Sequence, residues 1–248
     1  MVKAVVVRAA GTNCDYETMH ALKLAGFKPE LVHVNEFIQK KKKLSEFSLL
    51  VVPGGFSFGD YMGSGKVFAN KLSLKMNREL TDFIVKGNLV LGICNGFQVL
   101  VKAGILPGFG NVYNKQLTTL TFNNSGRFQD EWIRLNTVKK NNCVFAKGIE
   151  SFACPINHGE GKFIPQSKDI LKKLYANGQV VFKYENNPNG STDDIAGICD
   201  ETGRVLGLMP HPEKHLSSQN SPLSTRLDLE EEGEGLQLFR NAFGYLKK

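Results

Sequence analysis

The first hundred residues alternate between short, continuous apolar runs and longer segments with apolar residues at helical spacing. The apolar runs are Val2–Val7, Leu31–Val34, Leu49–Val52 and Leu89–Ile93. Runs of this length without polar alternation are typical of strands that are buried on both faces of a parallel sheet. The segments between them predict helices over 15–25 and 67–86, and each is followed by a glycine, Gly26 or Gly87, as suits a helix C-terminus.

Between Phe109 and Tyr184 the pattern changes to short apolar pieces separated by turns rich in Asn and Gly. We expect antiparallel strands here, added to the same domain. The further expected elements are strands at 117–122, 132–136 and 179–184, a hairpin of Ile195–Cys199 with Val205–Leu208, and a closing helix at Gly235–Leu246. The pattern predicts an α/β fold with a mostly parallel sheet flanked by helices, in a single domain over residues 1–248. Ser217–Glu232, rich in Ser and acidic residues, is expected to be flexible.

The composition agrees with the predicted α/β fold and bears on the class and location of the protein. The chain has 248 residues, 42% of them hydrophobic, and a net charge of +7, which are ordinary values for a soluble globular protein. No apolar run approaches the roughly 20 residues that cross a bilayer. The N-terminal residues lack the apolar core and cleavage site of a secretory signal, so we expect a cytoplasmic protein without a membrane segment.

The charge and the cysteines do not indicate nucleic acid or metal binding. Lys40–Lys43 supplies four of the net positive charges, and no aromatic residues are interleaved with it. We therefore expect a solvated charge run and no nucleic-acid partner. The 5 cysteines form no C-x-x-C pair, so disulfides and a structural zinc are not expected either, and each thiol is judged separately.

Cys94 is the strongest candidate for a nucleophile. It lies in Gly92-Ile93-Cys94-Asn95-Gly96, where the strand 89–93 meets a helix. Flanking glycines at such a junction are typical of a nucleophile elbow, a sharp turn that holds one side chain above the sheet. The positive end of the helix dipole at this position favours the thiolate form of a cysteine. The alternative is a small buried cysteine with a packing role only.

His211 is the best candidate for the base that a cysteine nucleophile needs. It lies in Met209-Pro210-His211-Pro212-Glu213, directly after the predicted strand Val205–Leu208. Residues i and i+2 of an extended segment point the same way, so Glu213 can reach the imidazole and orient it. Nucleophile, base and orienter would then be Cys94, His211 and Glu213. An exposed turn carrying His and Glu is the alternative.

Backbone donors for an oxyanion are expected beside Cys94. Gly54 and Gly55 directly follow the strand Leu49–Val52, and parallel strands end at the same edge of a sheet. The two glycines would let the chain bend so that an amide points into the site, and the amide of Asn95 is the natural second donor. Taken alone, Gly-Gly could also be a plain turn.

Three segments together resemble the class I (triad) glutamine amidotransferases. They are Gly-Gly-Phe-Ser-Phe-Gly-Asp at 54–60, Gly-Ile-Cys-Asn-Gly-Phe-Gln at 92–98 and Met-Pro-His-Pro-Glu at 209–213. Within that family the chain is most similar to the glutaminase subunits of phosphoribosylformylglycinamidine (FGAM) synthase, and the similarity extends over the whole chain. Further motifs in family order are 11–15, 124–128, 157–161 and 187–191.

The resemblance implies a flavodoxin-like fold and a glutaminase that uses Cys94 as nucleophile, His211 as base and Glu213 as its orienter. It implies that Gly55 and Asn95 supply the oxyanion amides and that Gln98, with Gly54 and Phe56 nearby, lies at the glutamine pocket. Cys14 falls in a family motif, but no His or acid is assigned to it, and we interpret it as structural. His158 is either near the path of ammonia or the partner, or in a plain surface loop.

The resemblance also implies partners and the division of chemistry between them. Ammonia would pass to a large PurL-type subunit that uses ATP and Mg²⁺ to convert FGAR to FGAM in purine biosynthesis, together with a small PurS-type subunit. The present chain would need no cofactor of its own. Gly59–Lys66 does not complete a Walker motif, because Val67 stands where Ser or Thr is required.

Two other classes of function stay open at the level of the sequence. One is a different cysteine hydrolase of the same layout, such as a peptidase or an amidotransferase of another pathway. The other is a non-catalytic redox or chaperone protein with a cysteine elbow. The second class would not need the pairing of His211 with Glu213.

Overall fold

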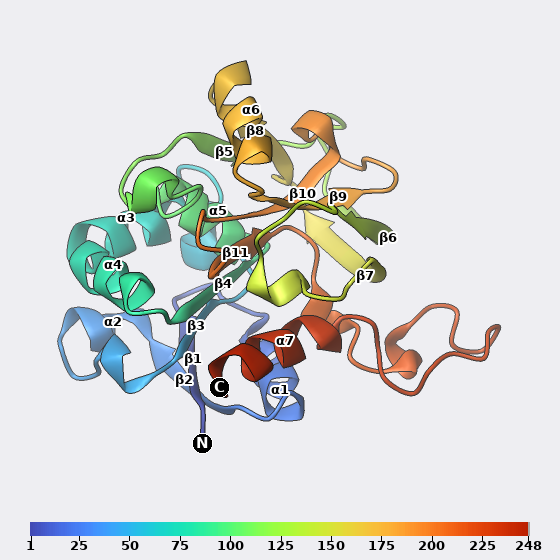
Figure 1. Cartoon of the computed structure of the whole chain (residues 1–248), viewed down its shortest axis with the longest axis horizontal. Helices are drawn as coiled ribbons and strands as arrows, with labels where there is room; N and C mark the ends of the chain where they lie inside the picture. Colours follow the sequence, from blue (N-terminus) through green and yellow to red (C-terminus); the bar gives the residue numbers. More distant parts are fainter. Residues whose placement is uncertain (248) are drawn as a thin grey trace.

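A nine-stranded mixed sheet forms the centre of the computed structural model, which describes residues 1–247 (Figure 1). The strand order is β2-β1-β3-β4-β11-β10-β9-β6-β7, and a separate two-stranded ribbon pairs β5 with β8. The strands are β1 Lys3–Arg8, β2 Lys28–His33, β3 Leu49–Val52, β4 Leu89–Ile93, β5 Thr118–Thr121, β6 Gln129–Thr137, β7 Ser151–His158, β8 Lys162–Pro165, β9 Val180–Tyr184, β10 Ile195–Cys199 and β11 Val205–Leu208.

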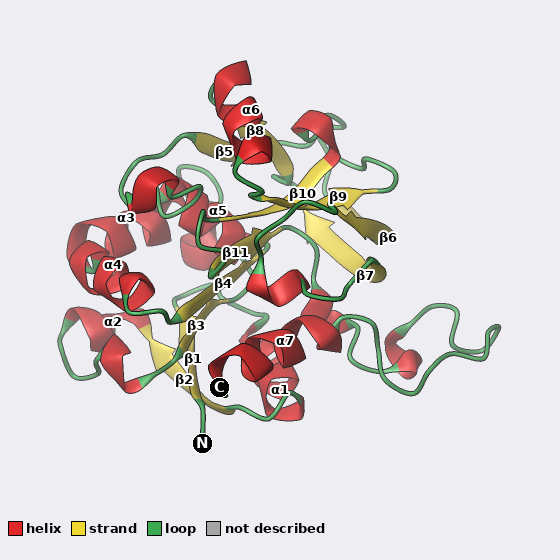
Figure 2. Ribbon diagram, in the orientation of Figure 1, coloured by secondary structure: helices red, strands yellow, loops and turns green. Residues whose placement is uncertain are grey.

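Helices cover both faces of the sheet (Figure 2). They are α1 Asp15–Leu24, α2 Val34–Ile38, α3 Lys66–Lys75, α4 Asn77–Val85, α5 Asn95–Lys102, α6 Lys168–Ala176 and α7 Leu236–Leu246. Short 3-10 helices occupy Leu44–Glu46, Ser57–Asp60, Phe109–Asn111, Val144–Ala146, Thr192–Asp194, Pro212–Lys214 and Ser218–Asn220. Helices α1 and α7 lie together on one side, and α3, α4 and α5 lie on the other. No helix within residues 1–247 combines the length and the apolar character needed to span a membrane.

The first five strands of the sheet form its parallel half. β1 pairs in parallel with β2 and β3, and β4 pairs in parallel with β3 and β11. Every residue of β3, β4 and β11 is buried, because helices cover both faces there. This half confirms the predicted α/β class, and the predicted bounds of β3, β4 and β11 agree with the structure.

The other four strands form an antiparallel half that continues the same sheet. β10 pairs with β11 in the predicted hairpin, with Ile198 opposite Gly207, and β9, β6 and β7 follow in antiparallel pairs. The pattern of the sequence did not predict β7, β8 or α6. Alternating burial along β7 explains part of this, since one of its faces is only partly covered and the run of apolar residues is interrupted.

The helix expected over 67–86 is in fact two helices. α3 closes normally, with Met76 N–H donating to Leu72 O (2.8 Å), but the backbone at Met76 leaves the helical region with φ −129° and ψ 3°. The break buries the Met76 side chain and redirects α4, which packs Leu80 and Phe83 against the core. The prediction of one continuous helix was therefore wrong.

Ser217–Glu232 forms a loop that projects from the body of the protein (Figure 1). Its two ends pair with each other, since Ser217 and Glu232 form an antiparallel bridge and Ser218 N–H donates to Glu231 O (3.0 Å). The loop begins four residues after Glu213 in the chain, so its stem is anchored close to the predicted site.

Candidate active site

Cys94 occupies a strained turn between β4 and α5. Its backbone has φ 51° and ψ −106°, a conformation that non-glycine residues rarely adopt outside functional sites. The flanking glycines allow the turn to pack closely: a Cβ on Gly96 would lie 1.8 Å from Val52 O, and one on Gly92 would lie 2.6 Å from Leu100 Cδ1. The predicted elbow is therefore present in the structure, with the Cys94 side chain at the carboxyl edge of the parallel strands.

His211 and Glu213 lie beside Cys94 at the end of the neighbouring strand. Cys94 N–H donates to Leu208 O (2.8 Å), which ties the elbow to β11 three residues before His211. His211 Nδ1 and Glu213 Oε1 are 2.6 Å apart, and both side chains are almost completely buried. His211 N–H donates to Pro155 O in β7 (2.9 Å), so the antiparallel half helps to hold the segment. The geometry brings the three predicted residues together.

The electrostatic environment favours a protonated His211. Burial alone lowers the pKa of this imidazole, but the carboxylate of Glu213 and the nearby thiols of Cys94 and Cys14 outweigh it and raise the pKa well above its usual value. Nδ1 is occupied by Glu213. Within residues 1–247, Nε2 is buried and has no partner with hydrogen-bond geometry, which leaves it available to exchange a proton with a thiol.

The same cluster contains donor types that metals use, but its geometry is that of a hydrogen-bonded set. Cys14 Sγ, a ring nitrogen of His211 and a carboxylate oxygen of Glu213 all lie within 4.8 Å of one another. Nitrogen and oxygen ligands of a tetrahedral zinc lie roughly 3.3 Å apart, given bonds of about 2 Å. The 2.6 Å contact between His211 and Glu213 is shorter than that and is a hydrogen bond.

The segment Gly54–Phe56 follows β3 and lies against the turn at Gly11–Cys14. Gly55 has φ +136°, and a Cβ there would lie 2.7 Å from Asn13 N, so only glycine fits. Phe56 N–H donates to Gly11 O (2.9 Å), whereas Gly55 N–H makes no hydrogen bond within residues 1–247. The amide of Gly55 is thus available for an oxyanion, and the amide of Phe56 is not.

Gly54 was predicted to let the chain bend toward an oxyanion, but in the structure it makes room for other side chains. A Cβ on Gly54 would lie 2.7 Å from His211 Cε1 and 3.2 Å from Cys14 Sγ. The missing side chain makes room for the imidazole and for the Cys14 thiol, which lie together over the glycine. The sequence assigned no His or acid to Cys14, because this contact joins residues that are 197 positions apart in the chain. The interpretation of Cys14 as structural stays a prediction.

Asn95 and Gln98 form a buried polar network behind the nucleophile. Asn95 Nδ2 donates to Gln98 Oε1 (2.9 Å) and to Asp60 Oδ1 (3.2 Å), and Asn95 Oδ1 accepts from Ser57 N–H (3.2 Å). Gln98 Nε2 donates to Glu160 O (2.7 Å). The side chains of Asn95 and Gln98 are thus engaged with the loops around the site. The backbone N–H of Asn95 lies in the first turn of α5, where helix amides have no partner within the helix, and it is the group of this network that can donate to an oxyanion.

Glu160 connects the two halves of the sheet across this network. Its carboxylate accepts from Ser64 N–H (3.1 Å) and pairs with Lys102 Nζ (3.5 Å), and Lys102 also donates to Ser64 O (2.6 Å). Burial lowers the pKa of Lys102, and the charge of Glu160 opposes this shift. Burial raises the pKa of Asp60, and the charge of Glu160 raises it further. No pattern in the sequence marks Glu160 or Asp60 beyond their place in family motifs.

His158, the last residue of β7, is buried and neutral. Its Nδ1 lies 3.1 Å from Asn123 Oδ1, and its Nε2 lies 3.5 Å from Asn189 Nδ2. Burial, followed by the nearby His211, lowers the pKa of His158 to about 4. The alternative of a plain surface loop was wrong for this residue, because it lies in a strand and is 2% exposed.

Phe56 and Phe128 lie at the outer side of the site, with ring centroids 6.2 Å apart. Both rings are about half exposed. Asn157, next to His158, supplies a backbone oxygen 3.8 Å from Cys94 Sγ. Residues from both halves of the sheet therefore lie around the Cys94 thiol.

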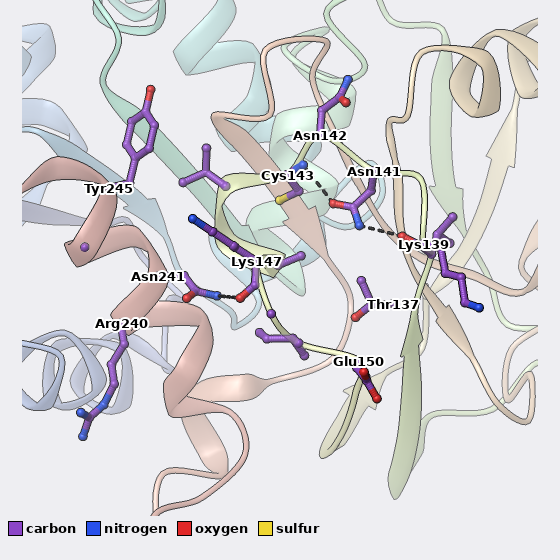
Figure 3. A pocket seen from close by; sticks show the side chains of 16 residues that line it. Thr137, Lys139, Asn141, Asn142, Cys143, Lys147, Glu150, Arg240, Asn241 and Tyr245 are labelled. Carbon is purple, nitrogen blue, oxygen red and sulfur yellow. Dashed lines mark hydrogen bonds between the residues drawn. The ribbon is translucent and has the colours of Figure 1, made fainter. Parts of the chain in front are cut away.

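A wide hollow on the protein, drawn in Figure 3, lies apart from the triad. It is lined by residues from β6, the Cys143–Ile149 segment and α7. Its side-chain amides are satisfied internally, since Asn241 donates to Lys147 O (2.8 Å) and Asn141 donates to Val138 O (2.7 Å). The hollow contributes no residue to the site described above.

Comparisons with known proteins agree with this geometry. The family model described as a CobB/CobQ-like glutamine amidotransferase domain matches residues 1–246. The chain is 43% identical to the phosphoribosylformylglycinamidine synthase subunit PurQ of Dehalococcoides mccartyi, over 100% of this chain and 98% of that relative. It is also 43% identical to PurQ of Treponema denticola, over 95% of this chain and 94% of the relative.

Solved structures show the same fold. The chain matches a structure of PurLQS from Thermotoga maritima with a TM-score of 0.77 and 32% identity, covering 99% of each chain. A glutamine amidotransferase from Thermotoga maritima matches with a TM-score of 0.54 at 19% identity, over 88% of this chain and 78% of that one, which supports the fold alone. Together these matches show that the chain belongs to the CobB/CobQ-like glutamine amidotransferases, among the PurQ subunits of phosphoribosylformylglycinamidine synthase.

Proposed function

We propose that Cys94, His211 and Glu213 hydrolyse the side-chain amide of L-glutamine and that the ammonia serves a synthetase partner. One observation carries the proposal: a strained, buried elbow thiol lies beside an imidazole whose other nitrogen is 2.6 Å from a buried carboxylate. Nucleophile, base and orienter in this arrangement are the parts that acyl transfer requires.

The first half of the reaction forms a thioester and releases ammonia. The thiol proton of Cys94 passes to His211 Nε2, and the thiolate attacks the amide carbon of glutamine. The amides of Gly55 and Asn95 donate to the oxyanion that develops. His211 then gives its proton to the amine as the carbon–nitrogen bond breaks, so ammonia leaves and a glutamyl thioester remains on Cys94.

The second half regenerates the enzyme. A water molecule loses a proton to His211 Nε2 and attacks the thioester carbon, and glutamate leaves as the sulfur takes back a proton from His211. Glu213 stays ionised throughout and stabilises each imidazolium state across the 2.6 Å contact. None of these steps calls for a metal or an organic cofactor in this chain.

We propose further that the ammonia passes to a PurL-type subunit that converts FGAR to FGAM with ATP and Mg²⁺, and that a PurS-type subunit completes the complex. The similarity to PurQ relatives over their whole length and to a chain of the PurLQS structure supports this. A Walker motif that fails at Val67 also supports placing the ATP chemistry in another chain. Neither a nucleic-acid partner nor a membrane is part of the proposal.

A cytoplasmic location belongs to the same proposal. All five cysteines are free thiols, at Cys14, Cys94, Cys143, Cys154 and Cys199. Proteins of oxidising compartments commonly pair such residues, and cytoplasmic proteins keep them reduced.

Glutaminase assays on the protein alone and with its cognate synthetase test the proposal. We expect glutamate to form from glutamine, and the rate to rise when the synthetase, ATP and acceptor are added. Partner binding can favour an active arrangement of the loops at 56–61 and 157–161, and tenfold activation requires only about 1.4 kcal/mol of preference for that form. A complex that hydrolyses peptides but not glutamine would instead identify a different cysteine hydrolase.

A further inference from the structure

Cys14 places a second thiol at the catalytic imidazole. Its Sγ lies within 4.8 Å of a ring nitrogen of His211 and of a carboxylate oxygen of Glu213. It is 5% exposed, so solvent does not take the place of its protein neighbours. The residue precedes α1, and no step of the proposed reaction uses it.

The backbone around Cys14 also holds the strand end that carries the oxyanion amide. Cys14 N–H and Asn13 N–H both donate to Gly54 O, at 3.2 and 3.4 Å, and Thr12 forms a bridge with Gly55. Cys14 O in turn accepts from Thr18 Oγ1 (2.6 Å), which anchors the turn to the first turn of α1. One short segment thus contacts both the base and the oxyanion strand.

The thiol proton of Cys14 has a partner other than the imidazole. Cys14 Sγ donates to Asn13 Oδ1 (3.3 Å), which leaves the sulfur lone pairs for another donor. His211 Nδ1 is engaged with Glu213, so Nε2 is the ring atom that can donate to a sulfur. Gly54 keeps this space open, because a Cβ there would lie 3.2 Å from the sulfur.

We propose that Cys14 is a positioning residue: its sulfur lies close to the imidazole over Gly54, becomes the acceptor of a hydrogen bond from Nε2 once His211 is protonated, and so keeps the ring ready for Cys94. The proposal rests on the function proposed above. Cys14 exchanges no proton and forms no bond to substrate. When Cys94 has given its proton to Nε2, the second sulfur stabilises the imidazolium and so favours the pair of thiolate and imidazolium over the neutral pair.

Other titratable groups facing His211 fit this assignment. Glu213 faces it from the following 3-10 helix, Cys94 from the start of α5, and His158 from the end of β7. Cys154 in β7 lies against the backbone N–H of His211 and not against its ring. Glu213 and Cys94 already have assigned parts, and neutral His158 carries no charge that would stabilise an imidazolium, so Cys14 is the remaining group that supports it.

Alkylation of Cys94 by iodoacetamide, followed by peptide mass spectrometry, tests the proposal without using the glutaminase reaction. The quantity compared is the alkylation ratio, which is the rate at Cys94 near pH 7 divided by the rate near pH 9.5. In Cys14→Ala we expect this ratio to fall by about tenfold, because the variant loses one hydrogen bond to a charged group. Cys14→Ser keeps an acceptor and should recover the ratio to within about threefold of the unmodified protein. In the complex, kcat should follow the same order while KM changes little.

Cys143→Ala is the matched control, because Cys143 is equally buried, at 5% exposure, and lies in the segment of Figure 3 away from the triad. It should leave the alkylation ratio unchanged. If Cys14→Ala does not fold, Cys14→Val fills the space without an acceptor and repeats the comparison. The proposal would be overturned if Cys14→Ala or Cys14→Val left the alkylation ratio unchanged. It would also be overturned if the ratio in Cys14→Ser were as low as in those variants. A shifted ratio in a protein that does not hydrolyse glutamine would refute the glutaminase and leave the positioning of His211 intact.

Discussion

Each half of the sheet delivers one buried histidine to the same site, and the two differ in charge. His211 follows β11 in the parallel half and is 1% exposed, and His158 ends β7 in the antiparallel half and is 2% exposed. Burial lowers the pKa of both. For His158 the effect of burial prevails and the pKa falls to about 4. For His211 a carboxylate and two thiols outweigh burial, and the pKa rises well above its usual value.

The difference teaches that burial alone does not decide the protonation of a histidine at this site. Burial keeps a histidine neutral unless an anionic or sulfur neighbour outweighs it. The ring nitrogens of His158 face the side-chain amides of Asn123 and Asn189, which fix the ring but carry no charge to offset its burial. His211 has an anion at Nδ1 and the thiols of Cys94 and Cys14 nearby, the arrangement of a base that must accept a proton and release it. Four predictions test this division of labour.

Cys94→Ala has the largest expected effect. We expect glutamine hydrolysis to be lost, because no other group is placed to attack the amide, while synthesis of FGAM by the complex continues when ammonia is supplied directly. Coupled assays with glutamine and with ammonium measure the two activities. Appreciable glutamine turnover by the variant would show that the nucleophile lies elsewhere.

Glu213→Gln should lower kcat by roughly two to four orders of magnitude, as the loss of the orienting carboxylate does in a Ser-His-Asp site. The variant keeps the size of the side chain but removes the charge that raises the pKa of His211, so the two histidines should become alike. Imidazole resonances followed by NMR as a function of pH would show this directly. A variant with normal kcat and an intact thermal transition would exclude Glu213 from the triad.

The parallel half could be predicted from the sequence because its signals are local. Buried strands such as Leu49–Val52 are continuous apolar runs, and the elbow is marked by glycines within two residues of Cys94. Since parallel strands end at one edge, placing His211 near Cys94 needed no knowledge of distant contacts. The pairing of His211 with Glu213 was likewise predictable, because both residues lie in the five-residue segment Met209–Glu213.

The rest of the site depends on contacts between segments far apart in the chain. Cys14 meets His211 only once α1 and β11 are assembled, and Glu160 meets Ser64 across the two halves of the sheet. β7, which carries His158, is half covered and interrupted by Pro155, so its pattern resembled a loop. Gly54 makes room for the imidazole only in the folded chain, so its position in the sequence does not indicate this role.

His158→Gln should change how stability depends on pH. A base whose pKa falls from 6.5 in the unfolded chain to about 4 in the folded one costs stability as the pH drops between these values. At about pH 4.5 the native protein should lose about 2.5 kcal/mol from this group that the variant does not lose. Denaturant unfolding at about pH 7 and 4.5 measures the difference.

His211 does not alter the comparison. Its pKa is raised on folding, so its stabilising effect is complete below pH 6.5 and declines as the pH rises from there through its folded pKa, equally in both proteins. Carboxylates titrate in both proteins and cancel in the comparison. Equal slopes for the native protein and His158→Gln would mean that His158 is not held neutral.

Glu160→Gln should have the smallest effect, because it weakens the link between the halves without touching the triad. Glu160 holds Ser64 N–H and Lys102 next to the loop that carries Phe56, so its neutral replacement should loosen the wall of the pocket more than the chemistry. We expect KM for glutamine to rise about tenfold, the size of one hydrogen bond to a charged group, and kcat to change by less than about twofold. Glu150→Gln, an exposed change in the antiparallel half, is the control and should leave both constants unchanged. A fall in kcat at constant KM would instead place Glu160 in the chemical step, and the two halves would then share the catalysis and not only the binding of glutamine.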